Sequence, residues 1–128
     1  MKILIEVPSW LGDAVMTTPA IENLLSQYNH PEITLIGSFS TVELLKNHPK
    51  VVKVSFLKKN FFSLFKIAKN LGHFDVYFSF RTSLRAKFFK TLISSNIKYQ
   101  FVNDKNQNIH QVKKYNDFIN ESLSINTS

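Results

Sequence analysis

The chain has 128 residues and carries 16 basic against 9 acidic side chains, which gives a formal net charge of +7. This length suffices for one domain with a hydrophobic core and is too short for two domains of ordinary size. The sequence has no cysteine and only four scattered histidines, so neither a disulfide nor a metal site is expected. The N-terminal apolar run is too short for a signal peptide, and no run approaches the ~20 apolar residues that span a bilayer. We therefore expect a cytoplasmic protein.

The excess of positive charge favours an anionic partner, which could be a nucleic acid, a membrane surface or a phosphorylated substrate. The basic residues are fourteen lysines, spread along the chain, and two arginines, Arg81 and Arg85, which lie four positions apart. A guanidinium group offers phosphates and carboxylates a rigid two-pronged contact that lysine lacks. The arginine pair suggests a specific anion contact, and the alternative is a solvated charged face.

The N-terminal stretch predicts the first strand, turn and helix of an α/β sheet. Residues 3–7 are apolar and β-favouring apart from one charge, Glu6, and are typical of a buried strand. Pro8 and Gly12 indicate a turn, and a helical pattern opens at Asp13. Ligands of such sheets bind outside the carboxyl ends of the strands, so the segment after this strand is where we expect chemistry. Asp13 is the leading candidate.

The rest of the sequence alternates between strand and helix patterns. Pro19 interrupts the first helix, which either kinks there or ends in a turn before a new helix capped by Thr18; we favour the kink. Further strands are expected at residues 33–36, 51–57, 75–80 and 97–102, and further helices at residues 42–47, 58–71, 84–93 and 110–123. This alternation predicts a Rossmann-like, doubly wound α/β fold with a mainly parallel sheet of five or more strands. Residues 1–123 would form this domain, and residues 124–128 the start of a linker or a truncated end.

The loop after the strand at 75–80 carries the arginine pair. Ser83 can cap the helix at 84–93, whose apolar arc comprises Leu84, Phe88, Phe89, Leu92 and Ile93. Arg85 falls inside this arc. Because burying a lone charge is costly, we expect Arg85 either to pair with another group or to point into a polar cavity, which would lie beside the loop of Asp13.

Four stretches resemble glycosyltransferase family 9. The most specific is MKILIEVPSWLGDAVMTTP at residues 1–19, which is most similar to the family's ADP-heptose:lipopolysaccharide heptosyltransferase II branch. Three supportive pieces follow in the expected order: FDVY at residues 74–77, IKY at 97–99 and HQVKKY at 110–115. The four stretches are distributed over essentially the whole chain, so the resemblance extends along its length.

The resemblance implies the N-terminal half of a GT-B glycosyltransferase, the half that mainly binds the acceptor. The implied reaction is inverting and uses neither metal nor cofactor: a heptose hydroxyl of the lipid A-linked lipopolysaccharide inner core attacks the anomeric carbon of ADP-heptose. Asp13 matches the family's candidate base. The implied acceptor contacts are Ser9, Trp10, Arg81, Ser83 and Arg85, and the loop formed by Leu11 and Gly12 would approach the donor, which the C-terminal half mainly holds. The 128-residue chain alone would then be inactive.

An ordinary explanation of Asp13 remains open beside the catalytic one. An aspartate at a helix start caps unpaired backbone N–H groups and interacts favourably with the helix dipole. Capping would also lower the pKa of the carboxyl group and so weaken it as a base. Asp13 is therefore a base, a helix cap or both.

The basic and aromatic residues at 58–69 suggest a contact with the cytoplasmic face of the inner membrane, where a lipid-anchored acceptor lies. Phe61 and Phe62 stand between two lysine pairs there; the alternative is that Phe61, like Phe65, belongs to the core and Phe62 packs on a neighbouring loop. The competing function is a non-enzymatic α/β binding module for an anionic partner. Nucleic acid is not expected as that partner, because most aromatic residues have core spacing. A dinucleotide site is not expected either, since no Gly-x-Gly-x-x-Gly follows the first strand.

Overall fold

The computed structural model describes residues 1–8, 11–56, 61–81, 83–101 and 117–123 of the chain, without the side chain of Phe61. Within them lies one five-stranded sheet in the order β3-β2-β1-β4-β5, in which every pair of neighbouring strands is parallel. The strands are β1 (Lys2–Glu6), β2 (Glu32–Gly37), β3 (Val51–Phe56), β4 (His73–Ser79) and β5 (Ser94–Gln100). This order is that of a Rossmann-like fold, with the switch point between β1 and β4. The predicted fold class is confirmed.

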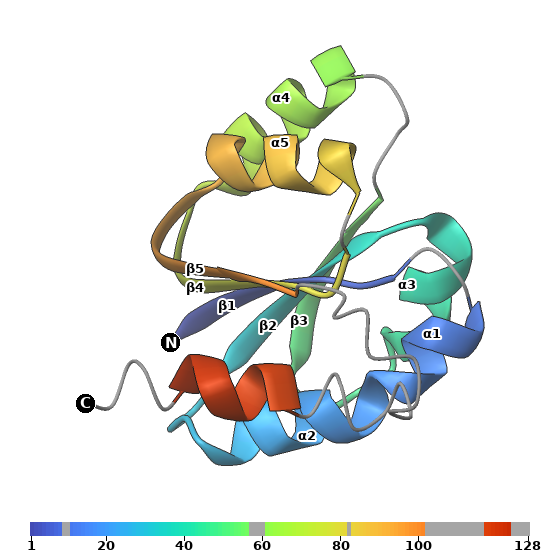
Figure 1. Ribbon diagram of the computed structural model, residues 1–128, viewed down its shortest axis with the longest axis vertical. Coiled ribbons are helices and arrows are strands. Elements are labelled where there is room, and N and C mark those ends of the chain that lie inside the picture. Colours follow the sequence, from blue (N-terminus) through green and yellow to red (C-terminus); the bar gives the residue numbers. More distant parts are fainter. Residues whose placement is uncertain (9–10, 57–60, 82, 102–116, 124–128) are drawn as a thin grey trace.

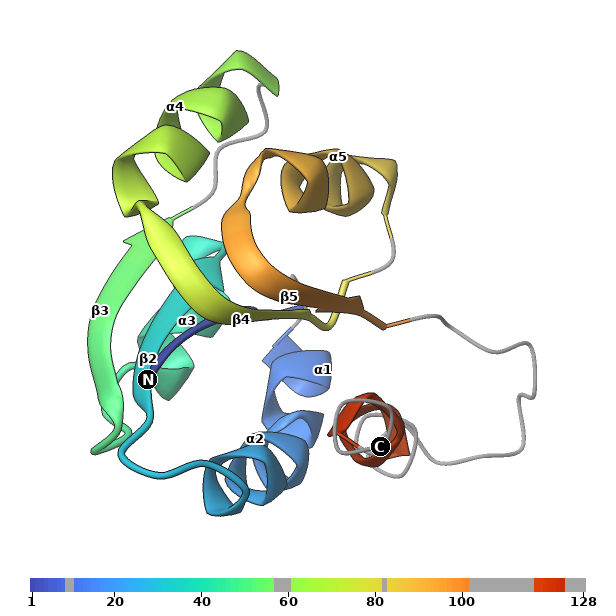
Figure 2. The same cartoon turned by 90° about the vertical axis from the view of Figure 1, so that its left-hand side faces the viewer.

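Helices cover both faces of the sheet (Figure 1). One face carries α4 (Phe61–Leu71) and α5 (Leu84–Leu92). The other carries α1 (Leu11–Met16), α2 (Thr18–Ser26), α3 (Phe39–Leu45) and a helical segment at residues 117–123. Figure 2, turned by a quarter, shows the same separation, with the segment 117–123 lying beside α1 and α2.

Side chains of β1 alternate between the two cores of the molecule. Ile3, Ile5 and Val7 are fully buried on the face covered by α2 and α3, whereas Leu4 is buried on the face of α4 and α5. Because successive side chains of a strand point to opposite faces, Glu6 shares the face of Leu4. A carboxylate thus lies where the pattern of the strand calls for an apolar residue.

The first helical region is divided differently from the expectation of one kinked helix starting at Asp13. α1 begins two residues earlier, at Leu11, and α2 starts at Thr18, with Thr17 between them. Pro19 has no N–H group to donate to the preceding turn and its ring crowds the carbonyl four residues before it, which breaks the helical hydrogen bonding there. The break therefore precedes the proline.

The apolar arc predicted for α5 is wrong in part. Leu84 is 81% exposed and Phe88 is exposed as well, while Ala86 and Phe89 are the buried residues of this helix. The helix therefore turns a different face to the sheet than its most apolar arc suggested. Phe65 of α4, expected on the apolar face, is also exposed.

Two glycines have a structural reason for lacking a side chain. A Cβ atom on Gly37 would lie 2.7 Å from Cγ2 of Val7, so the end of β2 passes close to the chain after β1. Gly72 has a φ of 80° and ends α4, as predicted.

Among the described residues, no helix is both long and apolar enough to cross a membrane.

Candidate active site at the switch point

The carboxyl ends of β1 and β4 meet at the switch point of the sheet. Their last residues, Glu6 and Ser79, are partners in the parallel register. Two candidate segments continue from these ends: the chain after β1 enters α1, and the chain after β4 passes Arg81 and enters α5. The fold therefore brings the regions of Asp13 and the arginine pair to the same edge of the sheet, where ligands of such folds bind.

The buried carboxylate of Glu6 connects the side chains at this edge by hydrogen bonds. Glu6 is 0% exposed, and its Oε1 accepts hydrogen bonds from the hydroxyl groups of Tyr77 at 2.7 Å and Ser79 at 2.8 Å. Its Oε2 accepts a longer bond, 3.4 Å, from a terminal guanidinium nitrogen of Arg81. Both carboxylate oxygens therefore have partners, as a buried charge requires.

The surroundings of Glu6 act on its pKa in opposite directions. Burial raises the pKa of this carboxyl group, and the hydrogen bonds from Tyr77 and Ser79 and the positive charge of Arg81 lower it; burial dominates. Burial and the neighbouring carboxylate hold the pKa of Tyr77 well above its usual range. The Tyr77 hydroxyl thus keeps its proton at any ordinary pH and serves as a donor to Glu6.

Arg81 is held at three points. Its guanidinium contacts Glu6, its backbone N–H donates to Oγ of Ser79 at 3.3 Å, and its carbonyl oxygen accepts from the side-chain amide of Gln100 at 3.2 Å. Its side chain is 16% exposed. The sequence analysis predicted Arg81 as an anion contact and did not connect it with Glu6, its acidic partner in the structure.

Asp13 is the third residue of α1 and is half-buried. Within the described residues its carboxylate has no hydrogen-bond or ion-pair partner, so neither a capping bond nor a charge partner accounts for it there. Leu11 and Gly12 are exposed, and nothing lies within 4 Å of a Cβ atom built on Gly12. Ser9 and Trp10, two predicted acceptor contacts, lie outside the described residues.

Ser83 and Arg85 lie at the start of α5. Oγ of Ser83 accepts a hydrogen bond from the backbone N–H of Ala86 at 3.1 Å, which confirms the predicted helix cap. Arg85 is half-buried, as its place in the predicted arc suggested, and no carboxylate of the described residues pairs with it. The polar cavity expected between Arg85 and the loop of Asp13 stays a prediction.

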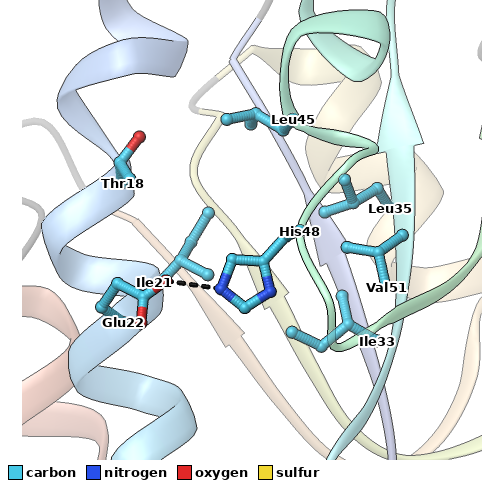
Figure 3. A pocket seen from close by; sticks show the side chains of 8 residues that line it. All are labelled: Thr18, Ile21, Glu22, Ile33, Leu35, Leu45, His48 and Val51. Carbon is cyan, nitrogen blue, oxygen red and sulfur yellow. Dashed lines mark hydrogen bonds and ion pairs between the residues drawn. The ribbon is translucent and has the colours of Figure 1, made fainter.

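A separate cavity lies between α2, β2 and β3 (Figure 3). Its volume is about 30 Å³, which accommodates a water molecule and not a sugar. Apolar side chains form most of its wall, and a hydrogen bond between the side chains of His48 and Glu22 closes one side. This cavity is a gap in the core rather than a substrate site.

In the part of the chain that the structure describes, no three His, Cys, Asp or Glu side chains gather as metal ligands do.

Comparison with known proteins gives matches in sequence and in structure. No family model matches the chain. Lipooligosaccharide heptosyltransferase 2 of Campylobacter jejuni serotype O:2 is 35% identical over 127 residues, which is 98% of this chain and 40% of that protein. The solved structure of a glycosyl transferase of family 9 from Veillonella parvula superposes with a TM-score of 0.80 at 17% identity and covers 97% of this chain and 41% of the other.

The structure of Escherichia coli ADP-heptose lps heptosyltransferase II superposes with a TM-score of 0.73 at 18% identity over 93% of this chain and 40% of the other. The chain thus spans about 40% of the length of its relatives, and the matched portion of the solved structures is N-terminal. Over 98% of its length, the chain is thus similar in sequence to a lipooligosaccharide heptosyltransferase 2, and its fold is that of the superposed part of the family 9 glycosyl transferase structure.

Proposed function

We propose that the chain is the acceptor-binding part of a heptosyltransferase that transfers heptose from ADP-heptose to the lipid A-linked inner core of lipopolysaccharide or lipooligosaccharide. The observation that carries this proposal is the switch point between β1 and β4, where the segments of Asp13 and Arg81 emerge side by side in a chain that is 35% identical to a lipooligosaccharide heptosyltransferase. Residues 1–123 would form the acceptor-binding domain, and residues outside this chain would hold most of the donor.

The proposed reaction is a single displacement. A hydroxyl oxygen of the acceptor heptose bonds to the anomeric carbon of the donor, the bond from that carbon to the ADP oxygen breaks, and the hydroxyl proton passes to the Asp13 carboxylate. A positioned general base contributes typically ~10²–10⁴-fold to such a step. The half-buried position of Asp13 and the lack of a described partner for its carboxylate support this role. Leu11 and Gly12 would border the donor.

Arg81, Ser83 and Arg85 would contact the acceptor, together with Ser9 and Trp10. The acceptor inner core carries carboxylates and phosphates, for which guanidinium groups are suited. Ser83 already uses its hydroxyl oxygen as a helix cap, so it would contact the acceptor by donating its proton. Arg81 is anchored by Glu6, whereas no described carboxylate neutralises Arg85.

The test joins these 128 residues to the remaining portion of the Campylobacter jejuni relative and follows heptose transfer from ADP-heptose to heptose-primed, lipid A-linked inner core. Asp13→Ala is expected to lower the rate at least a hundredfold without lowering the unfolding midpoint. Asp75→Asn is the matched control, because Asp75 lies at the opposite end of the sheet, where it accepts from the backbone N–H of Lys2. Binding of the inner core to the 128 residues alone is measured in parallel by calorimetry.

Two results would count against the proposal. Turnover by Asp13→Ala within tenfold of the parent would show that Asp13 is not the base. An inactive fusion, together with no binding of the inner core by the 128 residues, would favour the non-enzymatic binding module.

We further propose that the face formed by α4 and α5 rests on the anionic cytoplasmic surface of the inner membrane. Phe62 is 66% and Phe65 54% exposed, and the ammonium group of Lys66 lies 5.1 Å from the centroid of the Phe62 ring. Lys69 is exposed on the same helix, and neither helix contains an acidic residue. Exposed aromatic rings beside lysines are typical of peripheral membrane contacts. Such a location would bring the site near a lipid-anchored acceptor.

Co-sedimentation with vesicles of neutral lipid, with and without about one third anionic lipid, tests the membrane contact. A lysine near the surface contributes ~1 kcal/mol, so Lys66→Gln with Lys69→Gln should weaken binding to anionic vesicles by roughly 30-fold. Lys50→Gln with Lys53→Gln, two exposed lysines on or beside β3, is the control of equal charge. Equal losses for the two pairs would show that only net charge matters and would refute a specific membrane face.

A further inference from the structure

We propose that Glu6 is a positioning residue, which holds the guanidinium of Arg81 at the carboxyl edge of the sheet so that its remaining N–H groups meet the acceptor. This inference rests on the function proposed above. An arginine side chain has five N–H donors in a fixed plane, and the contact with Glu6 uses a single terminal nitrogen. Fixing one corner of that plane fixes the direction of the others.

Stability alone does not explain a carboxylate at this place. A central parallel strand is covered on both faces and normally carries a continuous apolar run. Replacing a buried ion pair by well-packed apolar residues is often neutral or stabilising. Glu6 breaks the apolar pattern of β1 at its last residue, which lies directly at the switch point of the fold. Such violations of a local pattern are expected at functional sites.

The two oxygens of Glu6 have different partners. Tyr77 and Ser79 both donate to Oε1, and Arg81 donates to Oε2. The hydroxyl groups therefore fix the orientation of the carboxylate, and the second oxygen is left to face the arginine. Because Tyr77 is fully buried and Arg81 is partly exposed, the cluster leads from the core to the surface.

Because the two oxygens of Glu6 have different partners, Glu6→Gln should disturb the contact with Arg81 and keep those with Tyr77 and Ser79. The amide oxygen of glutamine can still accept from Tyr77 and Ser79, but its NH2 group would face the guanidinium, so that one donor opposes another. The substitution keeps the size of the side chain and removes the anchor of Arg81. It therefore tests positioning with little disturbance of packing.

The experiment uses the fusion described above and four variants: Glu6→Gln, Arg81→Ala, the double variant and Ile33→Val. Ile33 is a buried residue of β2 at the other end of the sheet and controls for lost stability. We expect Glu6→Gln to raise KM for the inner-core acceptor at least tenfold while KM for ADP-heptose and kcat stay within twofold. Arg81→Ala should raise the acceptor KM at least as much, and the double variant no further, because residues that act as one unit are not additive.

A purely structural role gives a different pattern. Glu6→Gln would then lower the apparent kcat by reducing the folded fraction, as Ile33→Val would, and leave both KM values near those of the parent; its effect would add to that of Arg81→Ala. Either result overturns the positioning role. An acceptor KM within twofold of the parent for Glu6→Gln, or for Arg81→Ala, overturns it too.

A measurement on the 128 residues alone separates this inference from the proposed function. In the parent chain the side-chain Nε–H of Arg81 should give a sharp NMR signal in slow exchange with water, and Glu6→Gln should broaden it. A fusion that neither binds nor uses the acceptor refutes the proposed function and the inference with it. An active fusion whose Arg81 signal and acceptor KM are both unaffected by Glu6→Gln refutes the inference alone.

Discussion

Removing the hydroxyl group of Tyr77 tests whether Glu6 is ionised inside the fold. Tyr77→Phe keeps the ring, whose centroid lies 6.4 Å from that of Phe89, and removes the 2.7 Å bond to Glu6. Tyr77 and Glu6 are both 0% exposed, so bulk water does not replace the hydroxyl group as a donor to Glu6. A hydrogen bond to a charged group contributes ~1.5–3 kcal/mol, and one between neutral groups ~0.5–1.5 kcal/mol. The loss should therefore be larger where Glu6 is charged.

The dependence on pH has a definite sign. Burial holds the pKa of Glu6 in the folded state above its ordinary value of 4.5, so the folded state binds the proton more tightly than the unfolded state. The contribution of this group to stability is then full below pH 4.5 and is lost as the pH rises through the folded-state pKa. The Tyr77 bond lowers that pKa. Tyr77→Phe raises it further, so the destabilisation should grow with pH.

Urea unfolding followed by circular dichroism at pH 4 and pH 8 measures this effect. We expect Tyr77→Phe to lose ~0.5–1.5 kcal/mol at the lower pH and ~1.5–3 kcal/mol at the higher. Tyr28→Phe is the matched control, because the buried Tyr28 hydroxyl has no hydrogen-bond partner among the described residues. Equal losses for Tyr77→Phe at the two pH values would refute an ionised Glu6, and no loss at either would refute the hydrogen bond itself.

Four further outcomes can be measured by unfolding of the same chain. Gly37→Ala should cost ~1–3 kcal/mol, because its Cβ atom would lie 2.7 Å from a Val7 methyl; parental stability would show that β2 yields freely there. Gly12→Ala should leave stability unchanged or raise it by up to ~1 kcal/mol, since its Cβ atom meets nothing within 4 Å, so a drop in turnover of the fusion would reflect substrate contact alone. Ser83→Ala should cost ~0.5–2 kcal/mol through the lost cap of α5, and no change in midpoint would mean that another group caps the helix. The stability of Glu6→Gln relative to the parent should improve as the pH rises above 4.5, because glutamine has no charge to bury; a constant difference would contradict the raised pKa of Glu6.

Most of the fold follows from patterns that are local in the sequence. Apolar runs, turn residues and helical spacing placed every strand of the sheet, and the alternation of elements predicted its parallel character. The exact helix faces did not follow, because α5 has apolar residues on more than one side. Phe88 and Phe89 are neighbours in sequence, and only packing against β4 and α4 decides that Phe89 is the buried one. Periodicity cannot choose between two adjacent phenylalanines.

The candidate site was predictable only where a single position carried the signal. Arg81 stands out as one of two arginines, and Asp13 through its place after the first strand. The link from Glu6 to Tyr77 and Ser79 spans more than 70 residues and depends on the register of β1 against β4, which no local pattern supplies. One signal was present: Glu6 is the one charge in the apolar strand predicted at residues 3–7.

The first strand and the helix after it present two carboxylates in contrasting surroundings, and such contrasts assign roles in many active sites. Glu6 is fully buried, and both of its oxygens already accept hydrogen bonds from neighbouring side chains, so it has no access to an acceptor hydroxyl. A general base must come within hydrogen-bond reach of the proton it removes. In the proposed reaction this group is Asp13, which is half-buried and has no hydrogen-bond or ion-pair partner among the described residues. In the proposed mechanism Asp13 is therefore the base and Glu6 positions Arg81. Substitution of Asp13 should lower kcat, and substitution of Glu6 should weaken the affinity for the acceptor.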